Sequence, residues 1–187
     1  MKTNVSFLAL ALVLTAAIAT PARAQVVIFS TGPIGIVGWD SRAVDCRIVR
    51  GAALANLATA NVTFKPLKYG AIGLDCQVSA IMRVDPGFLN AFGLTFNNDN
   101  GLVGGVDQCF ISTTIGAYPY QTGLPILVSG FSTAGQVFSG IQTANIALLD
   151  FLDVNNNTYS VSIYLSRASG ATCNPIAFAT FLEEVLQ

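Results

Sequence analysis

The chain has 187 residues, of which 52% are hydrophobic and only 10% are charged, and its formal net charge is −1. So few cations leave no basic stripe that would displace counterions from phosphate, which excludes nucleic acid as a partner. Histidine is absent, and this excludes Ser-His-Asp and Cys-His catalysis as well as histidine metal ligands.

Residues 1–24 have the pattern of a cleavable export signal. Lys2 precedes an unbroken apolar or small stretch over residues 7–18, and the segment ends in the small-x-small sequence Ala-Arg-Ala. The stretch is shorter than the roughly 20 apolar residues that span a bilayer. We therefore expect an exported protein, periplasmic or extracellular, with no transmembrane segment after cleavage and a single domain over residues 25–187.

Apolar and polar residues alternate along much of this domain, which predicts half-buried strands. The alternation is clearest at residues 44–48, 74–84 and 159–165. Shorter segments of the same kind lie between turn sequences, at residues 26–29, 62–66, 94–96, 106–112, 126–131, 136–141 and 146–152. Many short strands at this spacing predict an all-β domain, an antiparallel β-sandwich of the jelly-roll or immunoglobulin-like kind. The strand order is not predicted.

Two segments do not follow the strand pattern. Residues 51–61 are rich in alanine and leucine, and they are compatible with one short helix. At the C-terminus, Asn174 and Pro175 precede a segment that fits an amphipathic helix. Its residues 176–182 also alternate as in a strand, so helix and strand both stay open there.

Four cysteines remain in the domain, and an even number in an exported chain predicts two disulfides. We favour Cys46–Cys76 and Cys109–Cys173, because Cys46 and Cys76 each lie on the apolar face of an alternating segment and each follow an aspartate. A zinc site is disfavoured, because there is no CxxC sequence and no histidine. The sequence predicts neither a metal site nor a cofactor.

One candidate for recognition is the segment that contains the only tryptophan. Trp39, Asp40 and Arg42 lie close together, and five of the 17 charges of the exported domain fall within residues 40–50. An aromatic ring next to carboxylate and guanidinium groups can stack on a sugar and hold its hydroxyls. The alternative is that Trp39 closes one end of the core and the charges pair across strands.

A second candidate is the tyrosine loop of residues 116–123, in which Tyr118 and Tyr120 flank a proline between two glycines. Stiff loops with exposed tyrosines are typical of binding surfaces. The alternative is a packed crossover loop whose rings cover the edge of the sandwich.

Carboxylate-pair hydrolysis is the one common catalytic mechanism that the composition leaves open. Asp150 stands out, because it interrupts an apolar segment and burial would raise the pKa of its carboxyl. Calcium ligands are available at residues 150–157 and 97–107, although neither stretch completes a known calcium loop. We expect structural roles for these side chains, with Asn-rich turns at both places.

Three functions follow from these patterns. The leading one is a non-enzymatic exported subunit with a structural, adhesion or self-assembly role, which self-associates through apolar strands such as residues 146–152. The second is a module that binds a surface glycan or another small ligand through Trp39 and the Tyr118/Tyr120 loop. The third is a carboxylate-dependent hydrolase.

Overall fold

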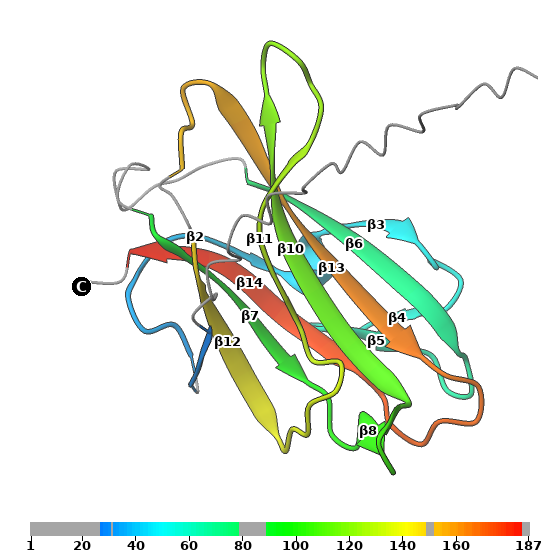
Figure 1. Ribbon diagram of the computed structural model, residues 1–187. Helices are drawn as coiled ribbons and strands as arrows, with labels where there is room; N and C mark the ends of the chain where they lie inside the picture. The colour runs from blue at the N-terminus through cyan, green and yellow to red at the C-terminus, as the bar shows by residue number, and fades with distance from the viewer. Residues whose placement is uncertain (1–26, 31, 79–88, 149–151, 185–187) are drawn as a thin grey trace, which may run out of the picture.

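The computed structural model describes residues 27–30, 32–78, 89–148 and 152–184, so the export signal predicted at residues 1–24 lies outside the described part. Regular structure within that part is almost entirely β, in two antiparallel sheets packed face to face (Figure 1). The predicted all-β sandwich is confirmed. No helix among the described residues has the length and apolarity needed to span a bilayer.

The larger sheet has seven strands. Its order begins β1-β12-β7-β14. The other edge of β14 pairs with β2 along one part and with β5 along another, and β4 lies beyond β5. The strands are β1 (Val27–Ser30), β2 (Ile36–Arg42), β4 (Ala55–Leu57), β5 (Val62–Phe64), β7 (Ala91–Asn97), β12 (Ile141–Ala147) and β14 (Ile176–Glu184).

The smaller sheet has five strands in the order β11-β10-β13-β6-β3. A short two-stranded ribbon of β8 and β9 stands apart from both sheets, and one turn of 3-10 helix, η1, joins β2 to β3. The elements are η1 (Ala43–Asp45), β3 (Arg47–Arg50), β6 (Gly70–Val78), β8 (Leu102–Val103), β9 (Val106–Asp107), β10 (Cys109–Pro119), β11 (Ile126–Ser132) and β13 (Asn157–Arg167).

The core lies between the two sheets and is built from the inward-facing residues of each strand. In β10 every second side chain from Cys109 to Ala117 is buried, and in β13 every second side chain from Tyr159 to Leu165 is buried, as the period of two predicts. Aromatic rings of the larger sheet pack across the gap, with Phe96 of β7 beside Phe131 of β11 at 5.9 Å between ring centroids. Gly93 of β7 lies under the ring of Phe181 in β14, where any Cβ would come within 2.1 Å of that ring.

The strand predicted at residues 159–165 is confirmed as β13, and the C-terminal segment forms a strand, β14. The helix considered at residues 51–61 is wrong: a turn at residues 52–54 leads into β4, because Ala55 pairs with Phe64 of β5. The strand predicted at residues 44–48 is wrong in its first half, where η1 carries the chain from one sheet to the other.

Both predicted disulfides are confirmed. Cys46–Cys76 ties the chain just after η1 to β6, with 4.5 Å between the Cα atoms. Cys109–Cys173 ties the start of β10 to the segment that leads into β14, with 6.2 Å between the Cα atoms.

Candidate functional site

A groove of about 310 Å³ lies where the chain crosses from the larger sheet to the smaller one. Three short stretches form its walls: the second half of β2, the end of η1 with the start of β3, and the second half of β6. The lining residues are Trp39, Asp40, Ser41, Asp45, Cys46, Arg47, Asp75, Cys76 and Gln77. We call this the Trp39 groove.

The two sheets bring these stretches together through their edges. β2 pairs with β14, and β3 pairs with β6 so that Arg47 lies opposite Asp75. The Cys46–Cys76 disulfide links two of these stretches, and both of its cysteines line the groove. The groove therefore depends on pairings between residues far apart in the chain and on one covalent link.

Trp39 is a wall of the groove and not an open stacking surface. Gly38 is buried beside it and Asp40 is exposed, and Trp39 itself is only 7% exposed and belongs to the main hydrophobic core. An indole in this position presents only a small part of its surface to a ligand. Since it is the only tryptophan in the chain, its emission still reports what enters the groove.

Two ion pairs organise the charged side chains at the groove. Arg42 holds the Asp45 carboxylate with two hydrogen bonds, of 2.7 Å from Nε and 3.1 Å from Nη2. The hydrogen bond to Asp45 and its negative charge raise the pKa of the Arg42 guanidinium. Arg42 does not line the groove itself, so it acts there only by orienting Asp45.

Asp75 is oriented from two sides. The Arg47 Nη2 donates a hydrogen bond to its Oδ2 at 2.9 Å, and the Ser160 hydroxyl of β13 donates to its Oδ1. Two partners fix the carboxylate in one orientation on the outer face of the smaller sheet. It then serves as an ordered acceptor at the groove.

Two polar side chains of the groove have hydrogen-bonding capacity to spare. Within the described part of the chain, neither the Asp40 carboxylate nor the Gln77 amide has a hydrogen-bond partner, and both residues are exposed. A carboxylate accepts only, whereas an amide both donates and accepts. Together they match a ligand that carries hydroxyl groups.

The tyrosine loop is a separate feature. Tyr118 and Tyr120 lie on the hairpin between β10 and β11, which projects from one end of the sandwich (Figure 1), and neither lines the Trp39 groove. Tyr120 is 62% exposed, and its hydroxyl donates to the Val154 carbonyl at 3.4 Å. The two groups of residues named from the sequence therefore do not form one site.

Asp75 and Gln77 are the site residues that sequence reasoning missed. They lie on the polar face of the alternating segment at residues 74–84. Because they flank Cys76, the predicted Cys46–Cys76 disulfide already brings them close to Asp45 and Arg47, which flank Cys46. The signal was therefore present in the disulfide assignment.

The other carboxylates considered from the sequence are used in turns or lie outside the described residues. Asp150 belongs to the second group. Asp153 caps its own turn, accepting from the backbone N–H groups of Asn155 and Asn156. Among the described residues, no three His, Cys, Asp or Glu side chains are arranged to hold a metal ion.

No family model and no curated protein matches the sequence. Among solved structures, the chain is similar to a non-crystalline cellulose specific carbohydrate-binding module, CBM28, with 11% identity over 70% of this chain and 77% of that one and a TM-score of 0.34. It is also similar to a CBM29-2 variant complexed with cellulohexaose, with 12% identity over 83% of this chain and 91% of that one and a TM-score of 0.28.

Proposed function

We propose that this protein is a non-catalytic binding module that holds a polyhydroxylated ligand, a neutral oligosaccharide, in the Trp39 groove. The observation that carries the proposal is the convergence of unengaged polar groups at one groove: Asp40 from β2 and Gln77 from β6. A groove of about 310 Å³ is at the lower end of the range for small-ligand sites.

The outer face of the smaller sheet extends the groove with hydroxyl groups. Ser162 of β13 lies directly opposite Asp75, and Thr114 of β10 lies directly opposite Ser162. Both side chains are exposed. Hydroxyl side chains donate and accept, as sugar hydroxyls do. A ligand longer than one ring has a polar path from the groove across β13 to β10.

The chemistry of the groove supports binding more than hydrolysis. Two of its three carboxylates, Asp45 and Asp75, are engaged in ion pairs with arginines. A general acid of a glycosidase must donate a proton to the leaving oxygen, and both of these carboxylates are already engaged as hydrogen-bond acceptors by arginines.

Trp39 fluorescence tests the proposal directly. We expect a saturable change in emission with at least one member of a panel of neutral oligosaccharides, such as β-glucan, mannan and xylan oligomers. Gln77→Ala should weaken that binding about 2–10-fold, because one hydrogen bond contributes roughly 0.5–1.5 kcal/mol. The matched control is Gln121→Ala on the distant hairpin, which should bind as the wild type does. No response across the panel, or equal losses in both variants, would overturn the proposal.

A second candidate function, self-assembly, is supported by a different observation. Residues 108–148 contain no charged side chain, and they form β10, β11 and β12 on one side of the sandwich. β11 is the edge strand of its sheet, and its Ile126 and Leu127 are exposed. Uncharged edges with exposed apolar side chains are prone to pair with another strand.

The assembly surface expected from the sequence needs a correction. Ile146 and Leu152, the ends of the segment proposed for self-association, are both buried in the core. Ile146 lies in β12, where residues 143–146 are all buried. The side of the sandwich that carries β11 remains exposed, and a second copy of this chain would bind there.

A further inference from the structure

The cations of this protein are divided into two groups. Arg42 and Arg47 each pair with an aspartate at the Trp39 groove. The other four in the described part of the chain form no ion pair within it: Arg50, Lys65, Lys68 and Arg167. Within the residues that the structure describes, four positive charges are thus left without a carboxylate partner.

These four cations gather around the start of β6. Arg50 lies opposite Gly73 on one side of that strand, and Arg167 lies opposite Gly70 on the other. Lys65 and Lys68 belong to the turn that leads into β6, where the Lys68 N–H donates to the Lys65 carbonyl. Positive charge is therefore concentrated at one end of the smaller sheet.

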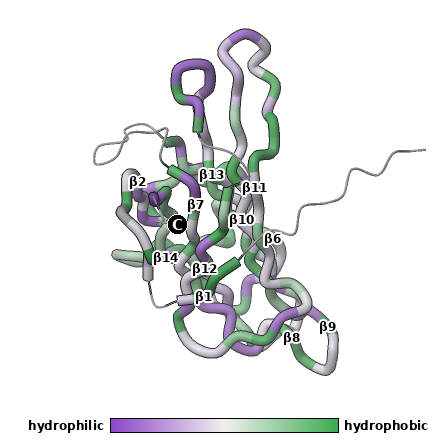
Figure 2. The backbone as a smooth tube through the Cα atoms, turned by 60° about the vertical axis from the view of Figure 1, so that its left-hand side comes forward, coloured by the Kyte–Doolittle hydropathy of each residue, from purple (hydrophilic) through white to green (hydrophobic). Residues whose placement is uncertain are grey.

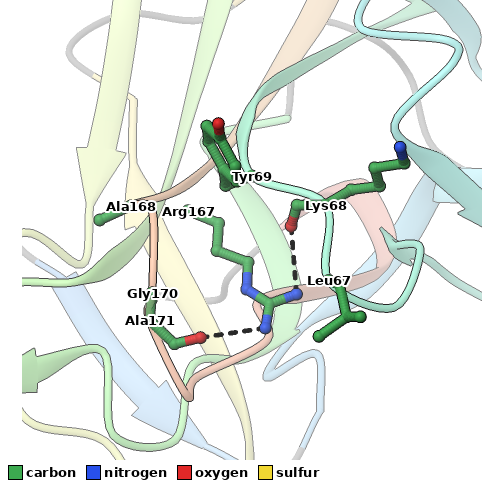
Figure 3. Close-up of a pocket in the computed structure, with 7 residues that line it drawn as sticks. All are labelled: Leu67, Lys68, Tyr69, Arg167, Ala168, Gly170 and Ala171. Atoms are coloured by element: carbon green, nitrogen blue, oxygen red, sulfur yellow. Dashed lines mark hydrogen bonds between the residues drawn. The ribbon is translucent and has the colours of Figure 1, made fainter.

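A second pocket, of about 160 Å³, opens at this end of the sheet (Figure 3). No carboxylate among the described residues lines it. Its walls are the turn before β6 and the segment after β13, with Leu67, Lys68, Tyr69, Arg167, Ala168, Gly170 and Ala171 as the lining residues.

Arg167 is held in place by backbone carbonyls and keeps donors to spare. Nη1 donates to the Lys68 carbonyl at 3.2 Å, and Nη2 donates to the Ala171 carbonyl at 3.0 Å, as Figure 3 shows. A guanidinium has five N–H donors in a rigid fork, so three are left. Because neutral carbonyls hold it, its full positive charge is retained in a fixed orientation.

The rest of the wall offers apolar surface beside that charge. Tyr69 is exposed, and Leu67 is 92% exposed. Leu67 also has a φ of 60°, a left-handed conformation that is unusual for a bulky side chain. Residues held in such conformations concentrate at binding sites. A ring and an exposed aliphatic group next to a guanidinium suit a ligand that carries an anion on a ring.

We propose that this pocket binds an acidic sugar, with its carboxylate or sulfate group on Arg167 and its ring against Tyr69. The flexible Lys68 side chain, whose ammonium points away from Arg167 in Figure 3, turns toward the bound anion. Guanidinium and ammonium groups both bind such oxyanions, and a fixed guanidinium does so with directional hydrogen bonds. The site shares no residue with the Trp39 groove, so it does not depend on the function proposed for that groove.

Nuclear magnetic resonance of the backbone amides separates this site from the groove. With glucuronate and with glucose 6-sulfate we expect saturable shifts of the Gly70, Ala168, Gly170 and Ala171 amides. Glucose, the neutral match, should leave them unchanged, and acetate or inorganic sulfate alone should shift them more weakly. Binding should weaken as NaCl rises, because salt screens exposed charges. The acidic sugar that binds with the higher affinity identifies the anion that the pocket prefers.

The variants are chosen to keep the loop intact. Lys68→Gln removes an ammonium and retains the carbonyl that holds Arg167, so it should fold normally and bind the preferred acidic sugar about 3–10-fold more weakly. Lys65→Gln is the matched control, because Lys65 lies in the same turn but does not line the pocket, and it should change binding less than about twofold. Arg167→Gln should abolish the shifts.

Three results would overturn the proposal. Glucose binding as tightly as its acidic derivatives would show that the charge is not recognised. Acetate or sulfate binding as tightly as the sugars would show that the ring is not recognised. Equal affinity of wild type and Lys68→Gln would remove Lys68 from the site.

Discussion

Glu183 of β14 is a fully buried carboxylate in a chain with few charges. Its Oε2 accepts hydrogen bonds from the backbone N–H groups of Ile34 and Gly35, both at 2.9 Å. Its Oε1 has no hydrogen-bond partner within the described part of the chain. The side chain thus ties the segment before β2 to β14, and β2 carries Trp39 and Asp40 into the groove.

The pKa of Glu183 makes a pH-dependent prediction. Burial raises the pKa of this carboxyl, and the hydrogen bonds from Gly35 and Ile34 oppose the rise with a smaller effect. The folded state therefore holds the proton to a higher pH than the unfolded state. Its stabilising contribution is complete below the ordinary glutamate pKa of about 4.3 and is lost as the pH rises through the raised folded value.

Glu183→Gln imitates the protonated carboxyl and cannot titrate. We expect its free energy of unfolding, relative to wild type, to rise as the pH increases above the ordinary glutamate pKa of about 4.3, as measured by urea unfolding at each pH. Glu184→Gln, the half-buried neighbour, is the control and should show a smaller slope. Glu183→Ala leaves two N–H groups unpaired and should cost about 1–3 kcal/mol. A difference between Glu183→Gln and wild type that falls with pH would contradict this assignment.

At the scale of elements, the disulfide between the segment after η1 and β6 has two effects. It closes a loop of 30 residues in the unfolded chain, and its two cysteines line the Trp39 groove. The Cys109–Cys173 disulfide closes a longer loop of 64 residues at a distance from the groove. The two links therefore form a natural comparison.

Replacing either pair of cysteines with alanine should destabilise the fold by about 2–4 kcal/mol, somewhat more for the longer loop. Only the Cys46→Ala/Cys76→Ala variant should also lose affinity for a groove ligand, because η1 and β6 are then no longer linked. Chemical unfolding measures the first effect, and titration of the folded variants with Trp39 as the reporter measures the second. Equal affinity in both variants would show that strand pairing alone shapes the groove.

The sequence predicts best those strands that have one face in the core and the other face in solvent. Strand β13 alternates cleanly, because one face meets the core and the other meets solvent. The C-terminal segment alternates too, but its choice of strand depends on pairing with β7 and β2, which lie far away in the chain. A local pattern holds no information about such partners, so helix and strand could not be separated there.

The candidate site was predictable in part for the same reason. Trp39 and Asp40 were found by composition, and the disulfide pairing followed from the faces on which the cysteines lie. The strand that holds Trp39, β2, was missed, because Gly38 and its neighbouring charges interrupt the alternation. The burial of the indole follows from the pairing of β2 with β14, which only the assembled sheet reveals.

At the scale of the whole molecule, charge is segregated. One side of the sandwich holds the Trp39 groove and the cations around the start of β6. The opposite side consists of β10, β11, β12 and β1, and residues 108–148 and 27–30 within it contain no charged side chain. Figure 2 shows apolar stretches along this side and up the projecting hairpin.

The uncharged side contains one edge strand of each sheet. β11 ends the smaller sheet and β1 ends the larger one, and they meet where the Phe29 and Phe131 rings pack at 5.7 Å between centroids. Two copies that pair through β11 around a twofold axis would place identical residues near each other. Charged edges would then repel, and this edge carries no charge to oppose such pairing.

Leu127→Lys tests that arrangement. Leu127 of β11 is 70% exposed, so the change should not disturb folding, but in a symmetric pair it would bring two like charges together. We expect the wild type to dimerise with rising concentration in sedimentation velocity and the variant to need at least about tenfold more protein, which corresponds to about 1.4 kcal/mol. Val49→Lys on β3 is the matched control, since Val49 is 56% exposed on the opposite edge strand of the same sheet. Dimerisation weakened equally by both changes would point to net charge and not to the β11 edge, and a wild type that stays monomeric at roughly millimolar concentration would remove self-assembly as a function of this fold.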